Sequence, residues 1–274
     1  MAKPLQDCII LFGDSLTERQ DVPQTLDERM NRAYGRKLDV LNRGFGGYTS
    51  TLGVALLDHI FAPKEDAAAS PVVRLVTLFF GTNDSVNFPN PRATPPEVFK
   101  SNTHHMLTQL TSPTSPYAIA DTPVHIILIT PPPPYDPQVP LPAKWVRDQA
   151  RSLRFAEAVR ELGKEWKVRE GSEENQTGWR VEVLDLWAEM EKRAGGLGHG
   201  LAPFFHDGCH MTTEGYQVLW DLYTDLIKGK WKGHGLDWED EQDLPMRVPW
   251  YGHLDMDQLE ESLKEELRLP ACRR

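Results

Sequence analysis

A serine follows the first apolar run of the chain, at the point where a buried strand of a parallel sheet would end. The run is Cys8–Phe12, and Gly13, Asp14 and Ser15 come directly after it. Functional residues of open α/β sheets lie beyond the carboxyl ends of the strands, so a nucleophilic serine would be placed here. Gly-Asp-Ser is also a common turn, and a serine in such a turn often only caps a helix. This segment alone leaves both interpretations open.

Two further apolar runs lead into groups that can donate hydrogen bonds to a developing negative charge. Asp39–Leu41 leads into a glycine-rich segment at 44–47, where backbone N–H groups are accessible because no Cβ intervenes. Leu75–Phe80 leads into Asn83, whose side-chain amide is either a turn former or an oxyanion donor. The glycines lack the Gly-x-Gly-x-x-Gly spacing of a dinucleotide site, so nucleotide binding is poorly supported.

A carboxylate and an imidazole occur three residues apart near the C-terminus, at Asp207 and His210, and Gly208 allows the segment between them to turn. In such a pair the imidazole can take a proton from serine, and the carboxylate fixes the tautomer of the ring. A zinc site is the alternative, because His206, Cys209 and His210 could all ligate a metal. Adjacent Cys and His do not match the usual ligand spacing, and we therefore expect no metal.

Five short apolar runs alternate with helical patterns, which is typical of βαβ units. The last two runs are Val124–Ile129 and Val181–Leu186, and nearly continuous apolar runs such as Val124–Ile129 are typical of strands covered on both faces. Helices are predicted from Thr25 to Gly35, after Thr94, from Trp145 to about Trp166, and from Thr212 to Gly229. The pattern predicts a three-layer α/β/α sandwich with a five-stranded parallel sheet and right-handed crossovers.

The composition disfavours several classes of partner. Forty acidic and thirty basic side chains give the 274-residue chain a formal net charge of -10, which disfavours binding to nucleic acid or to an anionic membrane. The chain has no apolar run near the ~18–20 residues that span a bilayer, and its N-terminus is too polar for a signal peptide. Three widely spread cysteines do not suggest a disulfide framework. We expect a cytoplasmic protein that acts on a small molecule.

The sequence changes character at Lys230. Tryptophans occur in a polar, acidic stretch, and a helical run through Leu259, Leu263 and Leu267 follows it. We therefore divide the chain into a main domain, 1–229, and a C-terminal extension, 230–274, that packs on this domain or on a partner subunit. A homodimer is a reasonable expectation, because the end of the extension is amphipathic.

The four motifs occur in one order, and together they closely resemble the sequence blocks of GDSL esterases of the SGNH hydrolase superfamily. Phe12–Thr17 resembles the first block, Asn42–Tyr48 the second, Gly81–Ser85 the third and Asp207–His210 the fifth, over roughly residues 7–228. Among the subfamilies, the chain is most similar to the isoamyl acetate-hydrolysing esterases. That similarity rests on the segments at 42–48, 79–85, 128–133 and 249–252.

The resemblance implies a role for each of these residues. Ser15 would be the nucleophile, His210 the general base and Asp207 the residue that orients it. The oxyanion hole would consist of the backbone N–H groups of Ser15 and Gly47 and the side-chain amide of Asn83. A flavodoxin-like strand order and the absence of a cofactor are also implied. The expected activity is hydrolysis of short-chain, acetate-type carboxylic esters by water through an acyl-enzyme.

Other functions stay open at this point. Lysophospholipase, thioesterase and sugar acetylesterase activities occur in the same superfamily. A metallophosphoesterase is less favoured, because Asp84 stands where that class needs a histidine, and a flavodoxin-like binding module would leave Asp207 and His210 without a purpose. Five aromatic side chains in or near the loops could line a substrate pocket, although packing in the core explains each equally well; these are Phe88, Tyr135, Trp145, Phe204 and Phe205.

Overall fold

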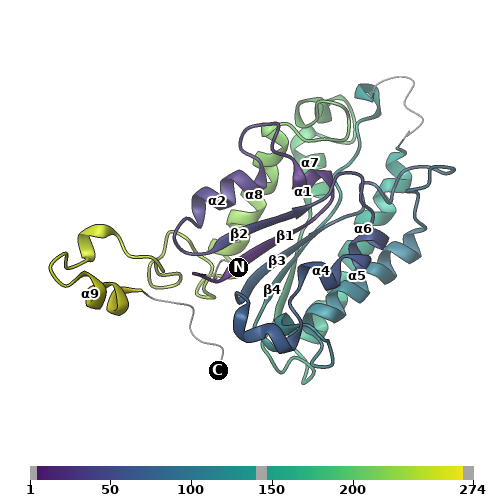
Figure 1. The fold of residues 1–274 in the computed structure, drawn as a ribbon. Helices are drawn as coiled ribbons and strands as arrows, with labels where there is room; N and C mark the ends of the chain where they lie inside the picture. The colour runs from purple at the N-terminus through teal and green to yellow at the C-terminus, as the bar shows by residue number, and fades with distance from the viewer. Residues whose placement is uncertain (1–4, 140–146, 268–274) are drawn as a thin grey trace.

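A parallel five-stranded sheet lies at the centre of the molecule, with helices on both of its faces (Figure 1). The structure, a computed structural model, describes residues 5–139 and 147–267. The strands are β1 (Cys8–Gly13), β2 (Asp39–Gly44), β3 (Val73–Phe79), β4 (His125–Ile129) and β5 (Arg180–Leu184). Every neighbouring pair is parallel, in the order β2-β1-β3-β4-β5. The predicted three-layer fold and its flavodoxin-like strand order are therefore confirmed.

Alternate residues of each central strand enter two separate hydrophobic cores. In β1, Ile9 and Leu11 face one core and Ile10 and Phe12 face the other. The first core is covered by α1 (Ser15–Glu18), α2 (Leu26–Ala33), α7 (Leu186–Ala194) and α8 (Thr213–Lys228). The second is covered by α3 (Ser50–Ala55), α4 (Leu57–Ile60), α5 (Pro96–Thr111) and α6 (Gln149–Glu170). Because both faces are covered, the central strands β1, β3 and β4 are largely apolar.

Several predicted boundaries differ from the structure, and three of them have a clear local cause. β2 does not end at Leu41 but continues to Gly44, because it stays paired with β1 as far as Gly13. The helix predicted from Trp145 begins at Gln149, where the Asp148 side chain accepts a hydrogen bond from the N–H of Ala150 at 2.9 Å. Trp145 itself lies outside the described residues.

The third boundary lies at the start of α5. Pro95 is the N-cap of this helix rather than Thr94, whose hydroxyl instead donates to the backbone carbonyl of Arg92 at 3.1 Å. Proline occupies the first helical position, at Pro96. Within the described part of the chain, none of the helices is both long and apolar enough to cross a bilayer.

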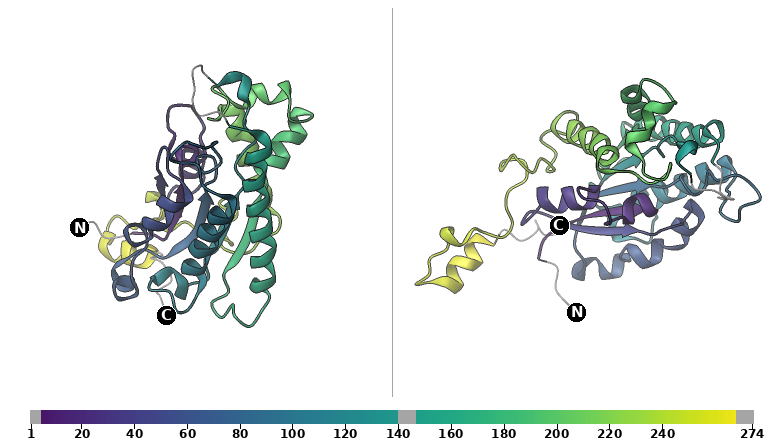
Figure 2. Two further views of the ribbon diagram at one scale, coloured as in Figure 1. Left: turned by 90° about the vertical axis from the view of Figure 1, so that its right-hand side faces the viewer. Right: turned by 90° about the horizontal axis from the view of Figure 1, so that it is seen from above.

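The segment predicted as a C-terminal extension has two parts in the described residues. In the first, Trp231, Leu236 and Leu244 are buried in the core beside α8, and the ammonium of Lys37 donates to the carboxylate of Glu241 at 2.6 Å. In the second, the chain leaves the domain, and α9 (Leu259–Glu266) has no buried residue (Figures 1 and 2). Large apolar side chains are exposed along this second part, including Trp250, Tyr251 and Met256.

A buried histidine at the start of β4 makes stability depend on pH. The His125 ring packs edge-to-face against Trp231, with ring centroids 4.9 Å apart, and burial lowers the pKa of His125 to about 4. The ordinary value is near 6.5, so between these pH values the unfolded chain binds more protons than the folded chain. The free energy of unfolding must therefore fall as the pH drops through this window, by about 2 kcal/mol between pH 7 and pH 5 from this residue alone.

Urea titrations of the wild type and of His125→Gln at pH 7 and pH 5 test this expectation. When the pH is lowered from 7 to 5, the free energy of unfolding of the wild type should fall by about 2 kcal/mol more than that of the variant. Burial also raises the pKa of Asp14 to about 7 and that of Asp84 to about 6, but both groups titrate in both proteins and their effects cancel in the comparison. An equal change in the two proteins would show that His125 is not the titrating group.

Candidate active site

The carboxyl ends of β1, β2 and β3 meet at one edge of the sheet. Gly13, the last residue of β1, lies in register between Gly44 of β2 and Phe79 of β3. The backbone of α1 passes so close to Gly44 that a Cβ there would overlap Glu18, so only glycine fits. The loops that carry the predicted serine, glycine and asparagine therefore begin side by side.

Ser15 is the first residue of the short helix α1, and several hydrogen bonds fix that helix. The buried carboxylate of Asp14 is the N-cap and accepts from the N–H of Leu16 at 2.9 Å. The Asn42 amide donates to a carbonyl oxygen of α1 at 2.9 Å, and the Tyr216 hydroxyl donates to the carbonyl of Leu16 at 2.8 Å. The backbone that carries the serine is thus held by contacts from β2 and α8.

Ser15, His210 and Asp207 form a chain of hydrogen bonds across 195 residues of sequence. Ser15 Oγ lies 3.0 Å from His210 Nε2, and His210 Nδ1 lies 2.6 Å from Asp207 Oδ2. The other carboxylate oxygen of Asp207 accepts from the backbone N–H groups of Cys209 at 3.0 Å and His210 at 2.7 Å. The structure brings together all three side chains that the resemblance implies as a triad.

The surroundings of Asp207 favour its ionised form. Partial burial alone would raise its pKa, but hydrogen bonds from the ring and backbone N–H of His210, the charge of that imidazole and the N–H of Cys209 together hold the pKa well below its ordinary value. A carboxylate at Nδ1 keeps the proton of a neutral imidazole on that nitrogen, which leaves Nε2 free to accept the serine proton. This arrangement can activate a hydroxyl for attack on a carbonyl carbon.

A tight loop presents Asp207 and His210. Phe205 and Met211 form an antiparallel bridge, and the N–H of His206 donates to the carbonyl of His210 at 3.1 Å. The neighbouring thiol of Cys209 is buried, and burial raises its pKa to about 11, so it remains protonated at neutral pH. The Cys209 thiol is therefore unreactive.

Gly208 allows this loop to turn, and its replacement should disturb the site. Its φ is +78°, and a Cβ would overlap the carbonyl of Tyr135, whose N–H donates to the Gly208 carbonyl at 2.8 Å. We expect Gly208→Ala to destabilise the fold by roughly 2–3 kcal/mol and to lower kcat, because the loop must move. Gly195→Ala is the matched control: its φ is +72°, but nothing lies within 4 Å of the added Cβ. Urea denaturation should show a larger loss in the free energy of unfolding for Gly208→Ala than for Gly195→Ala. Equal losses would contradict the overlap of the added Cβ with the Tyr135 carbonyl.

The two other predicted oxyanion donors lie in loops that are joined to each other. A turn closed by the N–H of Tyr48 and the carbonyl of Phe45, 3.1 Å apart, contains Gly47, which has a φ of +80°. The side-chain amide of Asn83, which is buried, donates to the carbonyl of Tyr48 at 3.0 Å. The loops after β2 and β3 are thus connected through Asn83.

The structure also shows contacts that the sequence did not predict. Arg92 Nη1 donates to Asn83 Oδ1 at 3.0 Å, and Arg92 lies beyond the Gly81–Ser85 block in the same loop, where the sequence carries no signal for this contact. Asp84 is fully buried and accepts from both the N–H and the hydroxyl of Ser50 at the start of α3. Within residues 5–139 and 147–267, no three His, Cys, Asp or Glu side chains are grouped so that they could hold a metal ion.

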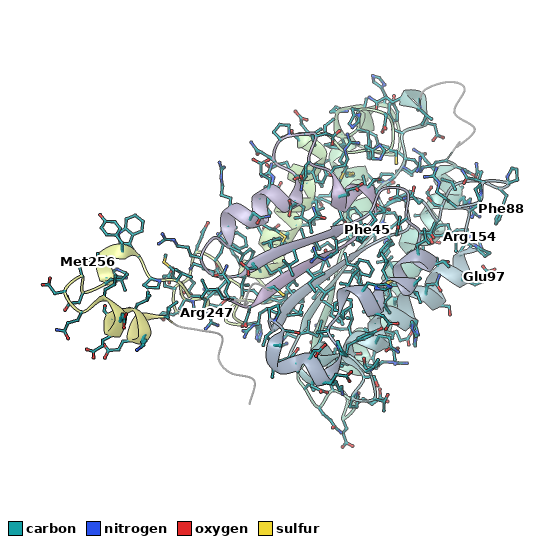
Figure 3. All side chains as sticks on the ribbon, viewed as in Figure 1. Phe45, Phe88, Glu97, Arg154, Arg247 and Met256 are labelled. Atoms are coloured by element: carbon teal, nitrogen blue, oxygen red, sulfur yellow. The ribbon has the colours of Figure 1, made fainter. Side chains whose placement is uncertain are left out.

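The aromatic residues proposed for a substrate pocket have different surroundings. Phe88 is 62% exposed at the outer edge of the molecule, where its ring covers the guanidinium of Arg151 (Figure 3). Tyr135 and Phe205 are buried in the core, and Phe204 is partly buried against it. Trp145 lies outside the described residues.

Known proteins with related sequences and structures are esterases. A model of the GDSL-like lipase/acylhydrolase family matches residues 11–218. A GDSL esterase/lipase of Arabidopsis thaliana is 27% identical over 90% of this chain and 93% of its own length. The isoamyl acetate-hydrolyzing esterase 1 homolog of Bos taurus is 29% identical over 81% of this chain and 82% of its own length. The crystal structure of a lipase/acylhydrolase from Enterococcus faecalis superposes with a TM-score of 0.56 at 25% identity, over 82% of this chain and 97% of that one. The resemblance seen in the sequence blocks is confirmed, and the chain belongs to the GDSL-like lipase/acylhydrolase family of carboxylic ester hydrolases.

Proposed function

We propose that this protein is a serine esterase that hydrolyses short-chain, acetate-type esters with Ser15 as its nucleophile. The observation that carries the proposal is the unbroken hydrogen-bonded chain from Ser15 through His210 to Asp207. Membership of an ester hydrolase family supports the same reaction class. The preference for acetate is supported by the mammalian relatives, which are named for isoamyl acetate hydrolysis.

In the proposed first step, His210 Nε2 takes the hydroxyl proton as Ser15 Oγ attacks the ester carbonyl carbon. Asp207 stabilises the imidazolium that forms. The tetrahedral oxyanion accepts hydrogen bonds from the backbone N–H groups of Ser15 and Gly47 and from the Asn83 amide, and a single such donor is worth ~3–4 kcal/mol. The imidazolium then protonates the departing alcohol, and an acetyl group remains on the serine.

In the second step, water takes the place of the alcohol. His210 removes a proton from the water as it attacks the acyl-enzyme, and the same donors hold the second oxyanion. Protonation of Ser15 Oγ releases the carboxylic acid and restores the starting site. The residues of the chain supply every proton transfer in this sequence, so we propose that no cofactor takes part.

The chain length of the acyl group provides the test. Rates on p-nitrophenyl acetate, butyrate and octanoate, each with and without EDTA, should fall as the acyl chain lengthens and should not respond to EDTA. A fluorophosphonate probe should label the protein once, on Ser15, as located by peptide mass spectrometry. A preference for octanoate would instead favour the lysophospholipase or thioesterase alternative. Loss of activity in EDTA without labelling would overturn the serine mechanism.

The proposal extends to location and assembly. Cys8 and Cys209 are buried free thiols, which is compatible with the reducing cytoplasm. We treat residues 230–274 as an extension of a main domain at 1–229, and the exposed apolar side chains of its second part, such as Trp250 and Met256, support a homodimer. Sedimentation at several protein concentrations distinguishes a dimer from a monomer.

A further inference from the structure

We propose that Arg92 is a positioning residue for ester hydrolysis, which holds the amide of Asn83 so that its N–H rather than its oxygen faces the oxyanion. This inference rests on the proposed function, because it concerns the oxyanion hole of the same site. Its basis is the contact between Arg92 Nη1 and Asn83 Oδ1 at 3.0 Å.

The chemistry of the two partners fixes the direction of the amide. A guanidinium has only hydrogen-bond donors, so the group that it contacts must be the amide oxygen. The amide nitrogen then points the opposite way, and one of its two hydrogens is donated to the carbonyl of Tyr48 at 3.0 Å. The second hydrogen is left for the oxyanion. A rotation of the amide by 180° would present two donors to each other at Arg92 and two acceptors to each other at Tyr48.

Several hydrogen bonds fix the loop that carries Arg92. The Arg151 side chain, from α6, donates to the carbonyls of Val86 at 3.1 Å and Thr94 at 2.8 Å, one on each side of Arg92. Inside the loop, the backbone N–H of Arg92 donates to the side chain of Asn90 at 2.9 Å. Arg92 is therefore anchored by its backbone as well as by its contact with Asn83.

The same guanidinium lies beside the second loop of the proposed oxyanion hole. A Cβ on Gly47 would come 3.7 Å from Arg92 Nη1, so this nitrogen reaches both Asn83 and the turn that contains Gly47. A positive charge at the amide oxygen also draws electron density away from the amide N–H and strengthens it as a donor. Both effects matter most when the oxyanion forms, so Arg92 should act on kcat rather than on substrate binding.

The experiment is a double-mutant cycle between Arg92 and Asn83 on p-nitrophenyl acetate. Arg92→Met, which keeps an unbranched apolar stem but has no donor, should lower kcat roughly 10- to 100-fold with KM changed less than about twofold. Arg92→Lys, which can still donate to Oδ1, should retain more activity than Arg92→Met. In the Asn83→Ala background, Arg92→Met should lower kcat by less than about twofold, because the amide that Arg92 positions is gone. Arg154→Met removes an exposed arginine of α6 (Figure 3) and should match the wild type.

The results separate this inference from the proposed function. If Ser15→Ala is inactive while Arg92→Met keeps the wild-type kcat, the esterase stands and the role of Arg92 is overturned. The role is also overturned if Arg92→Met costs as much without Asn83 as with it, or if Arg92→Lys is no better than Arg92→Met and both lower Tm. Full activity of Ser15→Ala overturns the proposed function itself, and the role of Arg92 falls with it.

Discussion

Ser15→Ala should lower kcat on p-nitrophenyl acetate by roughly 10⁴-fold or more, and this is the largest effect we expect from any single substitution. Alanine has no oxygen to form the acyl-enzyme, so only direct attack by water on the bound ester remains. Loss of the nucleophile from a serine–histidine–aspartate site typically costs ~10⁶ in kcat, and binding and oxyanion stabilisation account for the residual rate. Stopped assays under saturating ester, with enzyme at micromolar concentration, would quantify this residual rate.

The fold should survive this change. The Ser15 side chain contributes a hydrogen bond to His210, whereas the backbone of α1 is held separately by Asp14, Asn42 and Tyr216. Thermal unfolding should therefore give a Tm close to that of the wild type. Ser172→Ala, at an exposed serine just beyond α6, is the matched control and should keep full activity and full labelling of Ser15 by the fluorophosphonate. Activity above a few per cent in Ser15→Ala would assign the nucleophile to another residue.

The fold was predictable because its signal is local and repeated. Strands such as β3 and β4 face a core on each side, so nearly every residue in them is apolar, and the alternation with helices then requires parallel pairing. The boundaries that were predicted wrongly are set by contacts with neighbouring residues and strands. Asp148 caps α6 although an apolar pattern extends further towards the N-terminus, and Gly44 continues β2 because β1 offers it a partner.

The site was only partly predictable, because some of its contacts are set by the tertiary structure rather than by local sequence. Ser15, Asp207 and His210 lie in short motifs whose residue types limit their chemistry, and the register of the strands then places the serine at the sheet edge. Arg92 lies outside the motifs, beyond the Gly81–Ser85 block, and its contact with Asn83 depends on the path of the whole loop. Tyr135 lies in the segment after β4 and Phe205 lies two residues before Asp207, but tertiary packing places both in the core. Residue type alone does not distinguish them from the exposed Phe88.

Asp207→Asn should lower kcat by about 10⁴-fold through the tautomer of His210 rather than through loss of the fold. In the wild type, one carboxylate oxygen of Asp207 accepts from the backbone N–H groups of Cys209 and His210, and the other accepts from His210 Nδ1. Asparagine has one oxygen and one nitrogen for these two positions. The backbone donors require the oxygen, so the amide nitrogen is left to face Nδ1, where it must donate. His210 then carries its proton on Nε2 and donates to Ser15 instead of accepting from it.

This argument makes three measurements differ in a defined way. Tm should change little at neutral pH, because the backbone contacts of the loop are kept, whereas kcat should fall far more than KM rises. Asp21→Asn is the matched control: it removes an exposed carboxylate that pairs with Arg19 at the end of α1, and it should leave kcat within about twofold of the wild type. Retention of more than a tenth of the activity by Asp207→Asn would show that the carboxylate does not set the tautomer. A large loss in Asp21→Asn as well would show that net charge near the site, rather than the hydrogen bond to Nδ1, controls the rate.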